Sequence, residues 1–330
     1  MASEGITLNE NFTHQSSTHS TTIHWTTLGE PTNPPLIFIH GTPWSSVLWH
    51  PYAKALSSTY NAYLFDNPGF GESPGRTPLQ PSPTPPNNTN EIASLDASLA
   101  GQAESFAALY HFWGFKEDNL PHVIAHDVGG LISLRGFLLH GCKYASLCLI
   151  DVVALRPFGS PFFTVVGQNP DVFTSIPEAV FEGMLREYIR GAAFRPIPAE
   201  IEERLLRPWL SSRGGRRRGI GFIRQIAQAD ARDVEDVEGR YGEVGSVMPV
   251  KVLWGIEDRW IPAERAKELA WRMGARETVL IEDAGHLVMV DQPERVAIEI
   301  MGWMMRVTRS GNNQRSIGLR QYVCEQTAAA

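Results

Sequence analysis

Short apolar runs alternate along the chain with longer segments whose apolar residues recur at helical spacing. The short runs are typical of strands buried in a parallel sheet, and the amphipathic segments are typical of helices that cover it. We expect strands at 35–40, 62–66, 122–125, 145–150, 250–254 and 277–281, and helices at 96–114 and 263–273. The pattern therefore predicts an α/β fold with a mainly parallel sheet wrapped by helices.

The stretch between the fourth and fifth of these strands breaks the alternation. It contains prolines and no convincing strand, but it has helical patterns at 178–190, 199–209 and 220–230. Ligands bind at the carboxyl edge of open parallel sheets, so a helical insertion between two late strands is expected to cap that edge. The predicted units are a discontinuous core (20–155 and 247–307), a helical cap (156–246) and two flexible termini (1–19 and 308–330).

Composition and charge exclude several classes of function. Of the 330 residues, 43% are hydrophobic and 20% are charged, which is ordinary for a soluble globular protein. The formal net charge of −7 argues against a nucleic-acid surface, because binding a phosphate backbone needs a basic face. No apolar run is long enough for a membrane span, and the N-terminus lacks the pattern of a signal peptide. The three cysteines fit reduced thiols, so a cytoplasmic location is expected.

Four separated segments place chemically useful residues just after predicted strands. They are HGTP at 40–43, DNPGFGES at 66–73, HDVGG at 126–130, and the pair GIED at 255–258 and DAGH at 283–286. In this order they resemble the α/β-hydrolase family over about residues 20–305, and they imply the α/β-hydrolase fold. More narrowly, they resemble its aspartate-nucleophile branch, which includes epoxide hydrolases and haloalkane or haloacid dehalogenases.

The resemblance implies that Asp127 is the nucleophile. An aspartate in a turn before a helix is otherwise an N-cap residue. Here Gly129 and Gly130 follow it and allow the close approach of helix and strand that a nucleophile in this turn requires. A carboxylate suits attack on a saturated carbon, because its attack on an acyl carbon would give a reactive anhydride. We therefore expect an alkylating substrate and an alkyl ester on the enzyme.

The resemblance also supplies partners for the second step. Asp258 and His286 match the acid and the histidine of the family's triad, with Glu257 and Asp151 as alternative acids. The histidine, oriented by the acid, should take a proton from the water that hydrolyses the ester. The family places the oxyanion hole at two backbone N–H groups, here those of Thr42 and Val128.

The leaving group decides between an epoxide and a halide. Family dehalogenases often carry a tryptophan after the nucleophile and an asparagine after His-Gly, where this chain has Val128 and Thr42. Epoxide hydrolases usually donate a proton from two cap tyrosines. Tyr188 is one candidate and Tyr241 a weaker one, while Ile223 stands where the second is expected. An epoxide in an apolar small molecule is therefore the preferred substrate.

Other binding residues and other functions remain open from the sequence. Ligand contacts are expected from His40, Trp44, Tyr188 and Trp260. No metal or organic cofactor is implied, and the expected partner is a small apolar molecule. The rival functions are a dehalogenase with the same triad, a lyase, cyclase or isomerase that uses Asp127 as an acid–base, and a binding protein with a vestigial triad.

Overall fold

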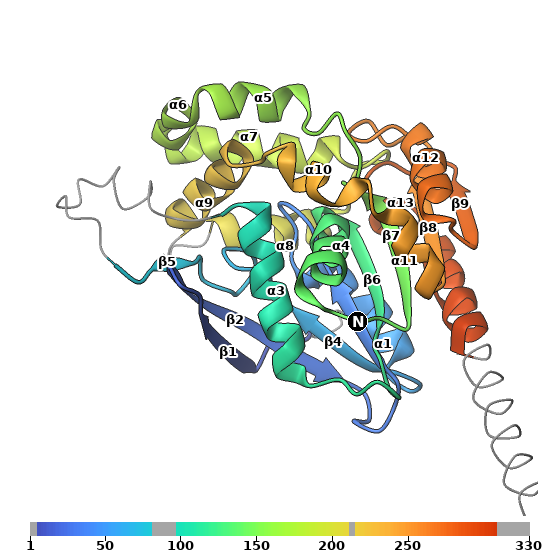
Figure 1. The fold of residues 1–330 in the computed structure, drawn as a ribbon. Helices are drawn as coiled ribbons and strands as arrows, with labels where there is room; N and C mark the ends of the chain where they lie inside the picture. Colours follow the sequence, from blue (N-terminus) through green and yellow to red (C-terminus); the bar gives the residue numbers. More distant parts are fainter. Residues whose placement is uncertain (1–4, 81–96, 211–214, 309–330) are drawn as a thin grey trace, which may run out of the picture.

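The computed structural model describes residues 5–80, 97–210 and 215–308, except for the side chains of 215–218. One sheet forms its centre, in the order β1-β2-β4-β3-β6-β7-β8-β9, with the short β5 paired to β2 (Figure 1). The strands are β1 (Glu10–Gln15), β2 (His19–Leu28), β3 (Pro35–Ile39), β4 (Asn61–Phe65), β5 (Thr77–Pro78), β6 (His122–Asp127), β7 (Ser146–Val152), β8 (Val250–Gly255) and β9 (Glu277–Ile281).

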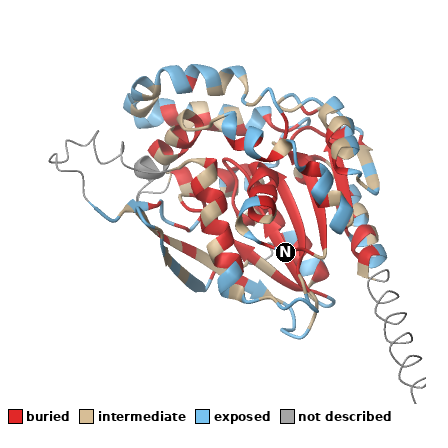
Figure 2. Cartoon of the chain, viewed as in Figure 1, coloured by how far each residue is buried: buried red, intermediate tan, exposed pale blue. Residues whose placement is uncertain are grey.

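Six strands that neighbour one another in the sheet, in the order β4-β3-β6-β7-β8-β9, run parallel, as the apolar pattern predicts. Every residue of β3, β6, β7 and β8 is buried, and Figure 2 shows these strands enclosed by helices. The helices on the core are α1 (His50–Leu56), α3 (Leu99–Trp113), α4 (Val128–His140) and α12 (Glu264–Met273), with a last helix at 293–308. One face packs against α3, α4 and α12, and the other against α1 and 293–308.

The stretch between β7 and β8 is helical, as expected, and lies across one edge of the sheet in Figure 1. Its helices are α5 (Pro161–Gln168), α6 (Pro170–Ser175), α7 (Glu178–Gly191), α8 (Ala199–Leu210), α9 (Gly215–Ala227), α10 (Arg232–Glu238) and α11 (Tyr241–Val247). Helices α5 to α9 pack on one another, whereas α10 packs on α4 and α11 on α12. The cap boundaries 156–246 remain a prediction.

The expectation of a flexible N-terminus up to residue 19 is wrong from residue 10 onward. Strand β1 pairs antiparallel with β2, and β2 pairs antiparallel with β4. Residues of β1 are exposed or half-buried, because β1 is an edge strand with a polar sequence. The predicted flexible segment 308–330 lies outside the described residues, apart from residue 308, which is the last described residue of the helix that begins at 293.

Candidate active site

Asp127 occupies the sharp turn between β6 and α4. Its backbone is at φ 55° and ψ −131°, which a residue other than glycine rarely adopts and which marks stored strain. A Cβ on Gly129 would lie 2.8 Å from the carbonyl oxygens of Ile39 and His40, and one on Gly130 would overlap Val152. Both glycines therefore allow α4 to begin directly against the sheet, as the sequence predicts.

Three side chains from different parts of the chain meet at this turn. Nε2 of His286 donates to Oδ2 of Asp127 at 2.9 Å, and its Nδ1 donates to Oδ2 of Asp258 at 2.9 Å. The exposed fractions are 5% for Asp127, 6% for Asp258 and 0% for His286. The fold thus brings together the three residues that the motifs predict, in the geometry of a catalytic triad.

Asp258, rather than Glu257, faces the imidazole. Oδ1 of Asp258 accepts hydrogen bonds from the backbone N–H groups of Trp260 at 2.7 Å and Ile261 at 2.9 Å. Oδ2 is therefore left to bind His286. The side chain of Glu257 accepts the N–H of Ala284 at 2.9 Å and ties two loops together. Of these two adjacent carboxylates, only that of Asp258 is in contact with the histidine.

Asp151, the other alternative acid, lies buried beside this group. Its Oδ1 accepts the N–H of Gly255 at 2.8 Å, and its Oδ2 has no partner among the described residues. Burial and the charge of Asp258 raise the pKa of Asp151 well above its usual value. Both effects favour the protonated, neutral form of Asp151, while Asp258 makes the hydrogen bond to His286.

The histidine is held as an imidazolium. Burial lowers the pKa of His286, but the carboxylates of Asp258 and Asp127 outweigh it and raise that pKa well above 6.5. Burial also raises the pKa of Asp127, but its hydrogen bond with His286 reverses the effect and leaves it below 3.8. Near neutral pH, Asp127 is therefore an ionised carboxylate paired with a positively charged ring.

The loop after β3 reaches the other oxygen of the nucleophile. The backbone N–H of Thr42 donates to Oδ1 of Asp127 at 2.9 Å. A Cβ on Gly41 would overlap this carboxylate, so the preceding position requires glycine. Val128 lines the cavity at the first turn of α4, where backbone N–H groups and the helix dipole favour negative charge. Of the two predicted oxyanion donors, Thr42 therefore contacts the carboxylate, and Val128 remains a prediction at the start of α4.

Two helices of the α5–α9 group form hydrogen bonds to the same loop after β3. The hydroxyl of Thr42 donates to Oε1 of Gln225 on α9 at 2.5 Å, and Nε1 of Trp209 on α8 donates to the carbonyl of Pro43 at 3.1 Å. All three bonding side chains are buried. Gln225 escapes sequence analysis because it lies 183 positions from Thr42 and belongs to no motif.

His40 also holds the loop after β3, through both of its ring nitrogens. Its Nδ1 donates to the carbonyl of Gly41 at 2.8 Å, and its Nε2 accepts the N–H of Asn67 at 2.9 Å. Burial lowers the pKa of His40, and the two bonds fix a neutral ring. The expectation that His40 touches a ligand is corrected here, because both ring nitrogens are occupied by backbone groups and the ring does not line the cavity.

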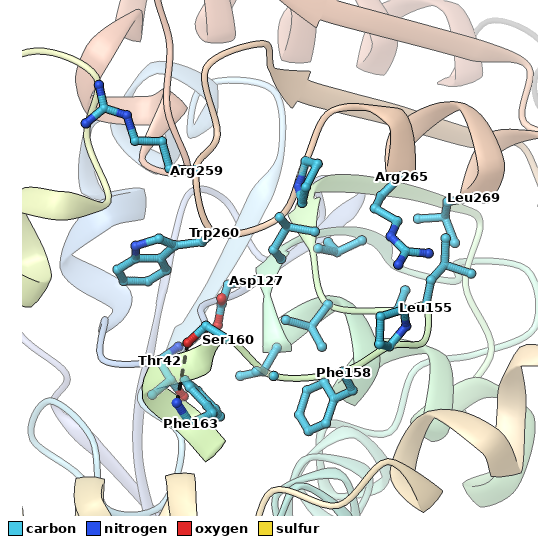
Figure 3. Close-up of a pocket in the computed structure, with 18 of the residues that line it drawn as sticks. Thr42, Asp127, Leu155, Phe158, Ser160, Phe163, Arg259, Trp260, Arg265 and Leu269 are labelled. Carbon is cyan, nitrogen blue, oxygen red and sulfur yellow. Dashed lines mark hydrogen bonds between the residues drawn. The ribbon is translucent and has the colours of Figure 1, made fainter. Parts of the chain in front are cut away.

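A cavity of about 310 Å³ opens over Asp127 (Figure 3). Tyr188 and Trp260 line it, as predicted, with ring centroids 4.4 Å apart. Trp44 is a further correction: it is 1% exposed and stacks behind Trp260 at 6.0 Å instead of lining the cavity. The weaker tyrosine candidate, Tyr241, does not line the cavity, and its hydroxyl donates to the buried carbonyl of Ala154.

His126 belongs to the HDVGG motif, but the motif does not reveal the role of its side chain. Its Nε2 donates to the backbone carbonyl of His286 at 2.9 Å, and its Nδ1 is buried without a partner among the described residues. Burial, helped by the neighbouring charge of His286, lowers the pKa of His126 to about 3. The ring is therefore neutral and fixes the backbone of the triad histidine.

Two features that would point to other classes of protein are absent from the described part of the chain. No group of three His, Cys, Asp or Glu side chains there is arranged to hold a metal ion. No helix there combines the length and apolar character needed to cross a bilayer.

A family comparison agrees with this geometry. The model of the alpha/beta hydrolase family matches residues 36–299, from the strand before the Thr42 loop to the last helix. The chain belongs to the α/β-hydrolase family. This hydrolase therefore carries a carboxylate at the position where β6 meets α4.

Relatives of the hydrolase differ in activity. A pimeloyl-[acyl-carrier protein] methyl ester esterase of Aeromonas hydrophila is 24% identical over 287 residues, which cover 81% of this chain and 94% of that protein. The crystal structure of an alpha/beta hydrolase fold protein from Burkholderia ambifaria is 33% identical, with a TM-score of 0.76 over 91% of this chain and 99% of that one. Haloalkane dehalogenase DbeA from Bradyrhizobium elkani is 16% identical, with a TM-score of 0.65 over 91% and 100%, which shows the fold alone.

The charge state of His286 can be measured without a substrate. Nitrogen-15 NMR of the hydrolase should show both ring nitrogens of His286 protonated at pH 7, a pH above the usual histidine pKa of about 6.5. The reason is that each nitrogen donates to a carboxylate. Asp127→Asn removes one carboxylate and should lower the pKa of His286. His126 is the internal control and should remain a singly protonated neutral ring. A neutral His286 at pH 7 in the unsubstituted protein would contradict the ion pair.

Proposed function

We propose that the hydrolase opens an epoxide in an apolar small molecule through an alkyl ester on Asp127. The observation that carries the proposal is an ionised carboxylate at the nucleophile position of this fold, with Oδ1 bonded to Thr42 and Oδ2 to His286. A carboxylate is a poor catalyst for acyl transfer, because the product would be an anhydride. The esterase activity of relatives is therefore not expected here.

In the first step, a carboxylate oxygen of Asp127 attacks an epoxide carbon and the carbon–oxygen bond of the ring breaks. The resulting alkoxide needs a proton. Tyr188 lines the cavity, and its hydroxyl has no hydrogen-bond partner among the described residues. Burial and the charge of Asp127 raise the pKa of Tyr188 well above 10, so the phenol is neutral and able to donate.

The proton balance links the two steps. Asp127 loses its charge when it becomes an ester, and His286 then keeps only one of its two carboxylate neighbours. The pKa of His286 should therefore fall, and the proton that the ring releases restores the phenol of Tyr188, which has given its own proton to the alkoxide. Ester formation thus converts an imidazolium into the base that the second step requires.

In the second step, neutral His286 takes a proton from water, and the oxygen attacks the carbonyl carbon of the Asp127 ester. The developing oxyanion lies where Oδ1 now accepts the N–H of Thr42. Val128 begins α4 and supplies the second donor expected at the positive end of that helix. Loss of the diol restores the carboxylate and the imidazolium.

The epoxide is preferred to a halide because of Tyr188. A halide leaves as an anion and needs N–H donors, but an alkoxide needs an acid such as this buried phenol. Ile223 stands at the position where the resemblance predicts a second tyrosine. It is buried and does not line the cavity. A single tyrosine is therefore assigned as the proton donor.

Single turnover in heavy-oxygen water tests the ester mechanism. With enzyme in excess over styrene oxide, the label should enter the carboxylate of Asp127 before it appears in the product. Peptide mass spectrometry measures this order. Asp127→Ala should abolish turnover and leave the melting temperature close to that of the parent. Label in the diol alone, with an unlabelled Asp127 peptide, would favour direct attack by water or a non-hydrolytic reaction.

Replacement of the base should separate the two steps. His286→Gln should still form the ester but fail to hydrolyse it, which gives a burst of one equivalent and an adduct on the Asp127 peptide. In the parent enzyme, lowering the pH should slow ester hydrolysis, because the ring becomes protonated, while ester formation persists as long as Asp127 is ionised. Failure of His286→Gln to form the adduct, with binding intact, would assign the histidine to the first step.

The proton donor is tested by Tyr188→Phe. Ester formation from an epoxide should fall by about 10²–10⁴-fold, with ester hydrolysis much less affected. Stopped-flow kinetics with a matched haloalkane should be insensitive to the change, since halide needs no proton. Tyr241→Phe is the matched control, because that buried hydroxyl serves a core carbonyl. If halide is released from a haloalkane faster than any product forms from an epoxide, the substrate is a halide rather than an epoxide.

A further inference from the structure

The charges in the cavity are unevenly distributed. The charged side chains that line it are Asp127, Arg259 and Arg265, so positive charge exceeds negative charge in a chain of net charge −7. Arg259 is exposed. Arg265 is more enclosed, with 25% of its side chain exposed, and Figure 3 shows it beside Leu155 and Leu269.

Arg265 is fixed by one of its nitrogens and leaves one edge free. Its Nη1 donates to the carbonyl of Arg156 at 2.8 Å and to Glu268 at 3.1 Å. Its Nε and Nη2 have no hydrogen-bond partner in the described part of the chain. Glu268 is shared with Nη2 of Arg272 at 2.8 Å, so this carboxylate does not serve Arg265 alone.

The free edge has the geometry that binds a carboxylate. Nε and Nη2 present two parallel N–H groups, which match the two oxygens of a carboxylate. The same edge of Arg306 binds Glu277 in this protein, with Nε to Oε1 at 2.6 Å and Nη2 to Oε2 at 2.7 Å. Arg265 lines the cavity, and the edge that it leaves without a partner among the described residues is the edge that Arg306 uses for an acid.

The wall between the two charged ends is apolar and short. Val152 is the register partner of Asp127, and residues 152–155 line the cavity up to Arg156, whose carbonyl holds Arg265. Four residues of extended chain span at most about 14 Å. A saturated chain of moderate length would therefore reach from the nucleophile to the guanidinium.

We propose that Arg265 forms a carboxylate-binding subsite, and that the substrate is an apolar chain with an acid at one end and the electrophilic carbon at the other. The inference rests on the proposed function for the reacting end only. Repulsion from Asp127 and attraction to Arg265 orient the chain, so that the acid lies away from the nucleophile and the reactive carbon lies against it.

Equilibrium binding tests the subsite without catalysis. Octanoate and its uncharged amide are titrated against the hydrolase, with fluorescence of the cavity residues Trp254 and Trp260 as the readout. Octanoate should bind about tenfold to a hundredfold more tightly than octanamide. Arg265→Met should remove this preference, and Arg265→Lys should keep part of it. Arg272→Met is the matched control, because Arg272 shares Glu268 but does not line the cavity.

Turnover then separates this inference from the proposed function. Epoxyoctanoate should exceed epoxyoctanamide in kcat/KM in the parent enzyme, but not in Arg265→Met. Equal binding of octanoate and octanamide, or a preference that survives in Arg265→Met, would overturn the subsite even if an Asp127 ester forms. An octanoate preference that depends on Arg265, in an enzyme that forms no ester, would support the subsite and reject the epoxide chemistry.

Discussion

The site depends on one buried arrangement of charge, an imidazolium between two carboxylates. Asp127, His286 and Asp258 lie within hydrogen-bond distance, and none is more than 6% exposed. Isolated charges are costly in such surroundings, so each must be paired and hydrogen-bonded. Backbone N–H groups supply the remaining bonds, one to Asp127 and two to Asp258. The ends of β6 and β8 and the loop after β9 must therefore converge at one point.

Glycine makes that convergence possible. A side chain at Gly41 would overlap the carboxylate of Asp127, and one at Gly285 would lie 2.8 Å from the carbonyl of Ala192. The loop that carries Thr42 is then clamped by His40 from the core and by Gln225 and Trp209 from the helices above. An N–H donor held from both sides is pre-organised, which is the property an oxyanion hole requires.

Sequence analysis predicts the parts of this structure that are local. The apolar runs predict the parallel strands, and Asp127, Asp258 and His286 are recognisable because each follows such a run. Strand β1 was missed because a polar edge strand lacks an apolar run. Gln225 and Arg265 were missed for another reason: their roles arise from contacts with Thr42 and Arg156, which are 183 and 109 positions away. Unlike the triad residues, which are also far apart in sequence, these two residues belong to no motif that marks them.

A carboxylate nucleophile reverses the direction in which charge changes at a triad. A serine triad starts neutral, and its histidine gains a proton in the first step. In the proposed mechanism the triad starts as an ion pair, and its histidine must lose a proton when Asp127 becomes an ester. The hydrogen bond from Thr42 is compatible with both states, since Oδ1 accepts it as a carboxylate now and as an oxyanion later. The fold can therefore keep its loops unchanged, while the residue at position 127 determines whether the first step requires a base.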